Sequence, residues 1–281
     1  MKKIKIICDS LSDIDIDMAK KNDIEMIPLT VIIEDKEYKD GIDISKDDFY
    51  KKLKEENVYP KTSQVTYAQF KEVFEKYIDE ETSILYIAAS STATGTYQSA
   101  VMAKNDIDGD IRVFDSQQVC YGIGRFVVEA VKLRDEGKNI DEILNSLEEM
   151  KEKVFVMFCA DTLEYLQKGG RISSTKAAIG NILNIKPILY VKDGLVSQLS
   201  QVRGKKNLIS KMVELAKSEC KDLSGQTVYV GYTDNDKKEI DKFVNSIKEN
   251  LNPDKVELFQ IGTGIGTHSG PGAMGLICLK K

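Results

Sequence analysis

The chain is poor in the residues on which most enzyme chemistry depends. It has a single histidine, no tryptophan and five prolines among 281 residues. A lone histidine gives little support to a Ser–His–Asp triad, and no Gly-x-Ser-x-Gly motif accompanies it. The five cysteines show no Cys-x-x-Cys spacing and no cluster with histidine, so no metal site is expected and the thiols are expected to be reduced and buried.

Charge and hydropathy disfavour two further classes of protein. The chain has 40 basic and 45 acidic residues, a net charge of -5 and no basic block, so no nucleic-acid partner is expected. Its longest apolar run, 154–160, is far shorter than the roughly 20 residues of a membrane-spanning helix. The apolar stretch after the N-terminal lysines stops at Asp9, which predicts a β-strand rather than a signal peptide. We therefore expect a cytoplasmic protein without integral membrane association.

Short apolar runs alternate with amphipathic helical patterns. Strands are predicted at KIKIIC, MIPLTVII, ILYIAA, IRVF, VFVMFCA, KPILYV, TVYVGY, VELFQI and GLICLK. Helices are predicted over 47–57, 66–77, 140–150, 204–220 and 234–251. This order predicts an α/β protein with a mainly parallel first sheet, and a hairpin about Asp193-Gly194 favours antiparallel pairing later. A boundary near residue 153 gives two domains, 1–153 and 154–281.

Three predicted strands of the first half end in serine or aspartate. These ends are Asp9-Ser10, Ser90-Ser91 and Asp115-Ser116. Ligands of open parallel sheets bind outside the carboxyl ends of the strands, so we expect the three ends to face one hydroxyl-rich crevice. Two alternatives stay open: the side chains cap the following helices, or Asp9 and Asp115 meet and hold Mg²⁺.

Four segments have polar or glycine patterns that packing alone does not explain: 60–66, 90–100, 161–174 and 262–281. The segment 90–100 follows a predicted strand and opens a helix, which would place Thr94 and the N–H of Gly95 at the positive helix N-terminus. In 161–174, Gly169-Gly170 ends a helix and leads into Arg171.

The last of these segments joins the only histidine, His268, to six of the 19 glycines. Glycine lets the backbone approach another group closely, so a ligand is expected there with the imidazole beside it. Its Gly-x-Gly-x-x-Gly match is not taken as a dinucleotide site, because the residues after it are predicted to form a strand and not a βαβ unit. Hydroxyls, a helix N-terminus, an arginine and this histidine together predict a pocket for one small anion, without a cofactor.

The order of these motifs resembles a known family. KTSQ, SSTATGTYQSA, VFDSQQVCYGIG, DTLEYLQKGGRIS, NIKPIL and THSGPGAMGL occur as they do in the DegV family of bacterial fatty-acid-binding proteins, and the resemblance runs from about residue 3 to 280. It implies a Rossmann-like first domain, a smaller α/β second domain and one long-chain fatty acid, such as hexadecanoate, buried between them. It also implies a non-catalytic protein. In some family members a separate ATP-binding kinase subunit phosphorylates the bound carboxylate.

The same resemblance implies which residues hold the ligand. The expected fatty-acid-binding residues are Thr62, Ser63, Thr94, Gly95, Arg171 and His268. Thr94 stands where the family has serine, and Val65 stands where it has proline, so the acyl preference is open to change while the carboxylate contact is kept. Arg203, just after the predicted hairpin, is expected to contact the kinase subunit or its nucleotide phosphates.

The acyl tail is expected to supply most of the affinity. Burying about 15 methylenes at ~0.8 kcal/mol each gives roughly 12 kcal/mol before the costs of association. Two apolar stretches, 122–131 and 177–183, are candidates for the wall of its tunnel, and each can instead be ordinary core.

Two other functions are compatible with the sequence. One is a stand-alone metal-dependent enzyme that uses Asp9 and Asp115 on a phosphorylated substrate. The other is a lipid-responsive regulatory or storage protein without a kinase partner.

Overall fold

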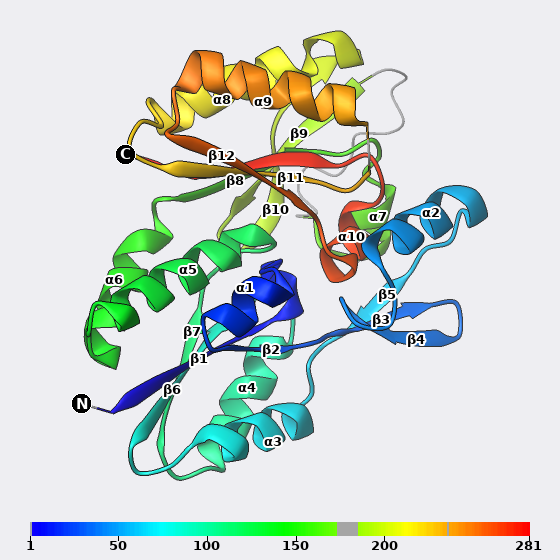
Figure 1. The fold of residues 1–281 in the computed structure, drawn as a ribbon. Helices are drawn as coiled ribbons and strands as arrows, with labels where there is room; N and C mark the ends of the chain where they lie inside the picture. Colours follow the sequence, from blue (N-terminus) through cyan, green and yellow to red (C-terminus); the bar gives the residue numbers. More distant parts are fainter. Residues whose placement is uncertain (1, 173–184, 235) are drawn as a thin grey trace.

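The computed structural model describes residues 2–172, 185–234 and 236–281. The N-terminal half of the protein is built on a parallel sheet. The strand order is β2 (Ile24–Ile27), β1 (Lys3–Asp9), β6 (Thr82–Ala88) and β7 (Asp110–Asp115). Figure 1 shows α3 (Tyr67–Tyr77) and α4 (Thr96–Asn105) on one face of this sheet, with α1 (Ile16–Lys21), α5 (Tyr121–Asp135) and α6 (Ile140–Lys151) on the other. This doubly wound arrangement confirms the predicted Rossmann-like first part.

The C-terminal half contains a six-stranded mixed sheet. Its order is β10 (Leu195–Arg203), β9 (Ile185–Lys192), β8 (Val154–Cys159), β13 (Met274–Leu279), β11 (Thr227–Tyr232) and β12 (Lys255–Gln260). The helices α8 (Leu208–Cys220) and α9 (Lys237–Leu251) cover its outer face (Figure 1). The hairpin of β9 and β10 turns at Asp193 and Gly194 with φ of 51° and 77°, as their sequence predicted.

A small antiparallel sheet between the halves was not predicted. It orders β4 (Lys36–Lys39), β3 (Thr30–Ile33) and β5 (Lys61–Ser63), and α2 (Lys46–Glu56) follows β4 in the chain. The single strand predicted at 26–33 is wrong, because the chain leaves β2 at Pro28 and enters another sheet. Proline has no N–H for the ladder and separates the two strands.

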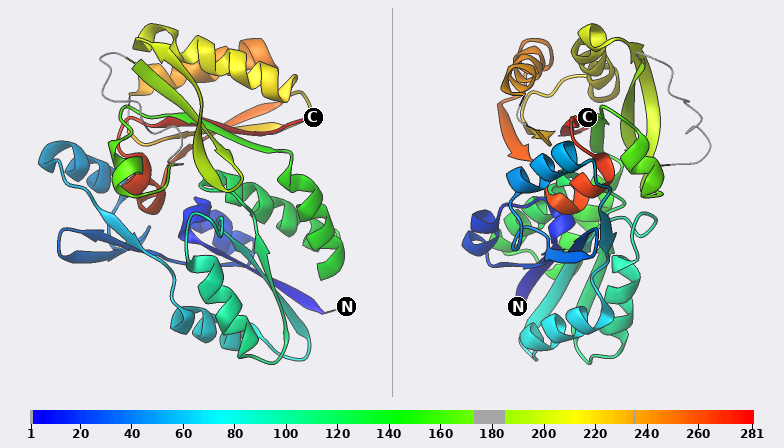
Figure 2. Two further views of the ribbon diagram at one scale, coloured as in Figure 1. Left: turned by 180° about the vertical axis from the view of Figure 1, so that it is seen from behind. Right: turned by 90° about the vertical axis from the view of Figure 1, so that its right-hand side faces the viewer.

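Two short helices complete the region between the halves. They are α7 (Glu164–Lys168) and α10 (Thr263–Ser269), and they pack against each other. The helix α10 also contacts α2, β3 and β5 of the N-terminal half, so it crosses from one half of the molecule to the other, as Figure 2 shows from behind. Of the helices in the described ranges, none is both long and apolar enough to cross a membrane.

Candidate functional site

A cavity lies between the two halves, beyond the carboxyl ends of the parallel strands. Its empty space, with the open mouth included, amounts to about 870 Å³. The segments after β1, β6 and β7 all contribute to its wall, so the expected crevice exists. The expected hydroxyl-rich lining is mostly wrong, because these segments contribute mainly apolar groups such as Leu11, Ala89 and Val119.

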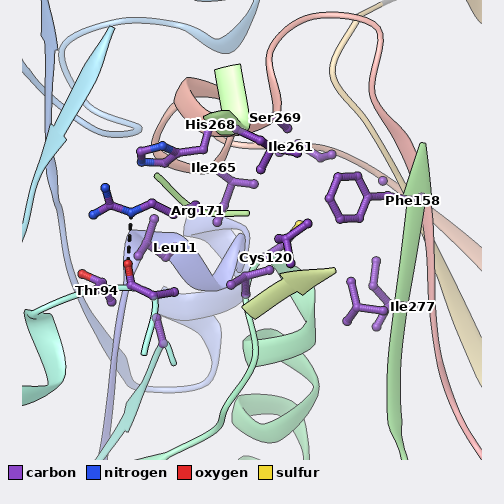
Figure 3. A pocket seen from close by; sticks show the side chains of 18 of the residues that line it. Leu11, Thr94, Cys120, Phe158, Arg171, Ile261, Ile265, His268, Ser269 and Ile277 are labelled. Atoms are coloured by element: carbon purple, nitrogen blue, oxygen red, sulfur yellow. Dashed lines mark hydrogen bonds between the residues drawn. The ribbon is translucent and has the colours of Figure 1, made fainter. Parts of the chain in front are cut away.

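Apolar side chains from both halves make up most of the cavity wall. Those of the C-terminal half lie on β8, β10, β12, β13 and α10 and in neighbouring segments, and the full apolar set is Leu11, Leu29, Ala89, Ala93, Val119, Cys120, Val156, Met157, Phe158, Leu166, Val196, Phe259, Ile261, Ile265 and Ile277. Figure 3 shows Phe158 and Ile277 at one end and His268, Arg171 and Thr94 at the other. The cavity therefore has an apolar end and a polar end.

Thr62 and His268 come together at the polar end, although 206 residues separate them. Thr62 lies on β5, His268 lies on the last turn of α10, and Thr62 Oγ1 is 2.9 Å from His268 Nε2. His268 Nδ1 is buried and has no hydrogen-bond partner among the described residues. Burial, followed by the charge of Arg171, lowers the pKa of His268 from 6.5 to about 4, so the imidazole is neutral at pH 7.

Arg171 reaches the polar end from the segment after α7. Its Nε donates to the carbonyl of Ala93 at 3.1 Å, and its Nη1 donates to the carbonyl of Gly169. These bonds tie the segment after α7 to the loop before α4 and leave a permanent positive charge beside the cavity. Gly169 fits under the imidazole, since a Cβ at this position would collide with His268 Nδ1.

Thr94 lines the cavity just before α4, close to the predicted position. Its Oγ1 accepts a hydrogen bond from the N–H of Thr96 at 3.3 Å and lies 3.0 Å from Thr96 Oγ1. The N-cap residue of α4, Gly95, makes no side-chain cap and packs against Gln64. The structure thus places Thr94 at the cavity and Gly95 behind it.

Ser63 and Gly95 are the two expected site residues that do not line the cavity. Ser63 is exposed and pairs with Thr30 on β3, and because successive side chains of a strand point to opposite faces, it points away from Thr62. For Gly95 the reason is the packing of Gln64, which fills the space over its Cα.

The two stretches proposed for the tunnel wall have different outcomes. The stretch 122–131 lies in α5 inside the core, and the cavity wall stops at Val119 and Cys120 just before it, so the alternative of ordinary core holds. The stretch 177–183 lies outside the described residues. Sequence reasoning missed Phe158 and Ile265, whose only sequence signal is their apolar character.

Three of the glycines near His268 serve a purpose other than the predicted one. Side chains of the N-terminal half pack directly over three of them: a Cβ at Gly262 would lie 2.5 Å from Asp13 Oδ1, a Cβ at Gly264 would lie 2.6 Å from Asp40 Oδ2, and a Cβ at Gly266 would collide with the Tyr50 hydroxyl. These glycines make room for the other half of the protein, so the expectation that they make room for a head group is wrong for them.

The carboxylates of Asp9 and Asp115 have protein partners. Asp9 accepts hydrogen bonds from the N–H of Leu11 at 2.9 Å and from the Tyr86 hydroxyl at 2.6 Å, and burial raises its pKa to about 6. Asp115 accepts from the N–H groups of Ser91 and Gln117. Within the described residues, no group of three or more His, Cys, Asp or Glu side chains could hold a metal ion. The bonds from the N–H groups of Leu11 and Gln117, each two residues after the aspartate, match the local capping alternative.

Arg203 is a surface residue and does not line the cavity. It is the last residue of β10, it pairs with Ile185, and it is exposed to solvent. Its position agrees with the expected surface location.

Comparison with known proteins places this geometry in a family. A family model described as "Uncharacterised protein, DegV family" matches residues 3–281. The chain belongs to the DegV family. A DegV domain-containing protein from Caldanaerobacter subterraneus is 38% identical over 100% of both chains.

Solved DegV structures share the fold along the whole chain. A fatty-acid-binding DegV family protein from Thermus thermophilus matches with a TM-score of 0.90 and 28% identity over 100% of both chains. DegV from Bacillus subtilis, described as a fatty acid binding protein, matches with a TM-score of 0.88 and 31% identity over 100% of both chains. A stearic-acid-binding protein from Eubacterium ventriosum matches with a TM-score of 0.88 and 26% identity, over 100% of this chain and 99% of the other.

Proposed function

We propose that this DegV protein binds one long-chain fatty acid in the cavity and presents its carboxylate to a separate ATP-binding kinase subunit. The observation that carries the proposal is the division of the cavity into an apolar part and a single polar end. An alkyl tail gains free energy only in the apolar part, and a carboxylate avoids a burial penalty only at the polar end. The solved relatives that are described as fatty-acid-binding support the choice of ligand.

The hydrogen-bond pattern at the polar end suits a carboxylate. A neutral His268 that carries its proton on Nε2 donates to Thr62 Oγ1 at 2.9 Å, which leaves the Thr62 hydroxyl proton free to donate to the ligand. Thr94 offers a second hydroxyl, and Arg171 adds the positive charge that a buried carboxylate needs. In this scheme the protein supplies orientation and neutralisation and no catalytic group.

Ligand content provides the first test. Organic extraction of the purified protein followed by mass spectrometry is expected to yield one fatty acid per chain, or titration of stripped protein with hexadecanoate is expected to give one site. A protein that carries no acyl chain and binds no added fatty acid would refute the proposal. Metal-dependent hydrolysis of a phosphorylated substrate, without a partner, would favour the stand-alone enzyme instead.

The head-group assignment is tested at two neighbouring residues of β5. Thr62→Ala should weaken hexadecanoate binding by about 10-fold to 100-fold, because a hydrogen bond to a charged group contributes about 1.5–3 kcal/mol. Ser63→Ala is the matched control, since Ser63 is exposed and outside the cavity, and it should bind as the wild type does. Equal affinities of the two variants would remove Thr62 from the site.

The kinase partnership is tested at Arg203. Arg203→Ala should leave hexadecanoate affinity within a few-fold and lower acyl-phosphate formation when an ATP-binding subunit is supplied. Lys192→Ala, an exposed cation at the other end of the same hairpin, is the control. Unchanged phosphorylation in Arg203→Ala would mean that Arg203 is an ordinary solvated side chain. If a pull-down with this protein captures no ATP-binding kinase subunit, a regulatory or storage role is favoured.

A further inference from the structure

The helix α10 does not have a sequence that folds into a helix by itself. Its seven residues, Thr-Gly-Ile-Gly-Thr-His-Ser, include two glycines, each of which costs about 1 kcal/mol relative to alanine in a helix interior. Isolated helices shorter than about 12 residues are marginal even with good sequences. The position of α10, and of His268 on its last turn, must therefore come from contacts with the rest of the molecule.

Two buried aspartates of the N-terminal half make the polar contacts at the start of α10. The N–H of Gly262 donates to Asp13 Oδ1 at 2.7 Å, and the Thr263 hydroxyl donates to Asp40 Oδ1 at 2.6 Å. Asp13 and Asp40 are only 7% and 3% exposed, so both carboxylates face the start of α10 in a dry environment. A negative charge at this end of a helix is stabilising, because the first N–H groups of a helix lack intrahelical partners.

The helix α10 packs closely against the N-terminal half along one side. The glycines at 262 and 264 let α10 approach Asp13 and Asp40, and Asp40 Oδ2 is buried over Gly264 without a partner among the described residues. One turn further on, Gly266 lies against the Tyr50 hydroxyl, which donates to the carbonyl of Ile261 at 2.9 Å. One side of α10 is thus fixed to the N-terminal half while Ile265 and His268 line the cavity.

We propose that Asp13 and Asp40 are positioning residues that hold α10 across the two halves and thereby fix His268 against Thr62 at the polar end of the cavity. Asp13 reaches the cavity by a second route, since the Cys120 thiol, which lines the wall, donates to its Oδ2 at 2.9 Å. Loss of either carboxylate contact frees the start of α10 and lets the two halves separate at this point. The consequence for ligand retention rests on the proposed fatty-acid function, whereas the consequence for His268 does not.

The single histidine gives a direct readout. Its imidazole is the only one in the chain, so one NMR signal in delipidated protein reports its pKa without assignment. In Asp13→Asn and Asp40→Asn the pKa of His268 should rise from about 4 toward 6.5, because the ring is no longer held in a buried position. Hexadecanoate should also dissociate about tenfold faster from both variants, which corresponds to about 1.4 kcal/mol.

Asp9→Asn is the matched control. Asp9 is a fully buried aspartate of the same half with a pKa raised to about 6, but its hydrogen bonds go to Leu11 and Tyr86 and not to α10. It should change overall stability and leave the His268 titration as in the wild type. The proposal is overturned if Asp40→Asn and Asp9→Asn give the same His268 pKa and the same dissociation rate.

Thr263 provides a second arm in case the aspartate variants do not fold. Thr263→Ser keeps the hydroxyl that donates to Asp40 and should titrate as the wild type does, whereas the isosteric Thr263→Val should shift the His268 pKa upward. Identical titrations of the two variants would overturn the proposal. A wild-type protein that binds no hexadecanoate would refute the proposed function only, because the NMR comparison is made without ligand.

Discussion

The helix α5 begins just after the cavity wall and α10 forms part of that wall, and different interactions hold the two helices. The helix α5 has fifteen residues and buries Ile123, Phe126 and Val127 in the main core, so burial of its own apolar face stabilises it. The helix α10 has seven residues, carries two glycines and is fixed by buried polar groups of the other half. The helix with the strong sequence pattern contributes packing, and the helix with almost no pattern carries the histidine of the candidate site.

The largest expected effect belongs to α5. Phe126 is fully buried with its ring 5.4 Å from that of Phe114, so Phe126→Ala should lower the free energy of unfolding by about 3–5 kcal/mol. Urea denaturation measures this, with Ile16→Ala at an exposed position of α1 as the control. At temperatures where the variant is folded, it should still bind one fatty acid. Loss of binding in folded protein would mean that α5 does line the tunnel.

The second expected effect is a pH dependence of the free energy of unfolding, which arises from His268 on α10. The unfolded chain protonates this histidine below about 6.5 and the folded protein only near 4, so folding loses stability as the pH falls through this range. Each pKa unit corresponds to about 1.4 kcal/mol, which predicts a loss on the order of 3 kcal/mol between pH 7 and pH 4.

The difference between the wild type and His268→Gln at each pH isolates this contribution. Asp9 and Asp13, whose pKa values burial raises to about 6, change stability in the opposite direction over the same range and cancel in that difference. A difference that does not vary with pH would show that His268 is not held in its buried, neutral state.

The third test is the sign of a glycine substitution. In a helix held by its own propensity, Gly→Ala stabilises by about 1 kcal/mol. Gly266→Ala should instead destabilise by about 1–3 kcal/mol, because its Cβ collides with the Tyr50 hydroxyl. Adding Tyr50→Phe should recover part of the loss. If Gly266→Ala stabilised the protein, α10 would be held by its own helix propensity and not by contacts with the N-terminal half.

The smallest effect is expected at Ile265, on the cavity side of α10. Ile265 is partly exposed and borders empty space, so Ile265→Ala should cost about 1 kcal/mol in ligand-free protein, below the range of about 2–5 kcal/mol for a packed isoleucine. The loss should be larger when hexadecanoate is bound, as thermal unfolding with and without ligand would reveal. Equal losses in the two states would mean that the ligand does not contact Ile265.

Most regular elements could be predicted from local patterns. The helix α3 begins after the capping box of Thr66 and Gln69, and β9 and β10 turn at Asp193-Gly194, where both residues have positive φ. Each of these features depends on neighbours in the chain, so the sequence contains the whole signal. The small sheet of β3, β4 and β5 could not be predicted in this way, because β3 and β5 are short and contact α10, which lies at least 200 residues further along the chain.

The sequence by itself determined the α/β class, the family and the identity of Thr62, Thr94, Arg171 and His268 as candidates, because order, composition and motifs are properties of the chain. Only the tertiary structure decided that Ser63 and Gly95 do not line the cavity and that Thr62 and His268 are 2.9 Å apart. It also decided that Gly262 and Gly264 serve the contact with Asp13 and Asp40. The physical reason is that a glycine pattern records how closely something approaches the backbone, and only the folded molecule shows what approaches it.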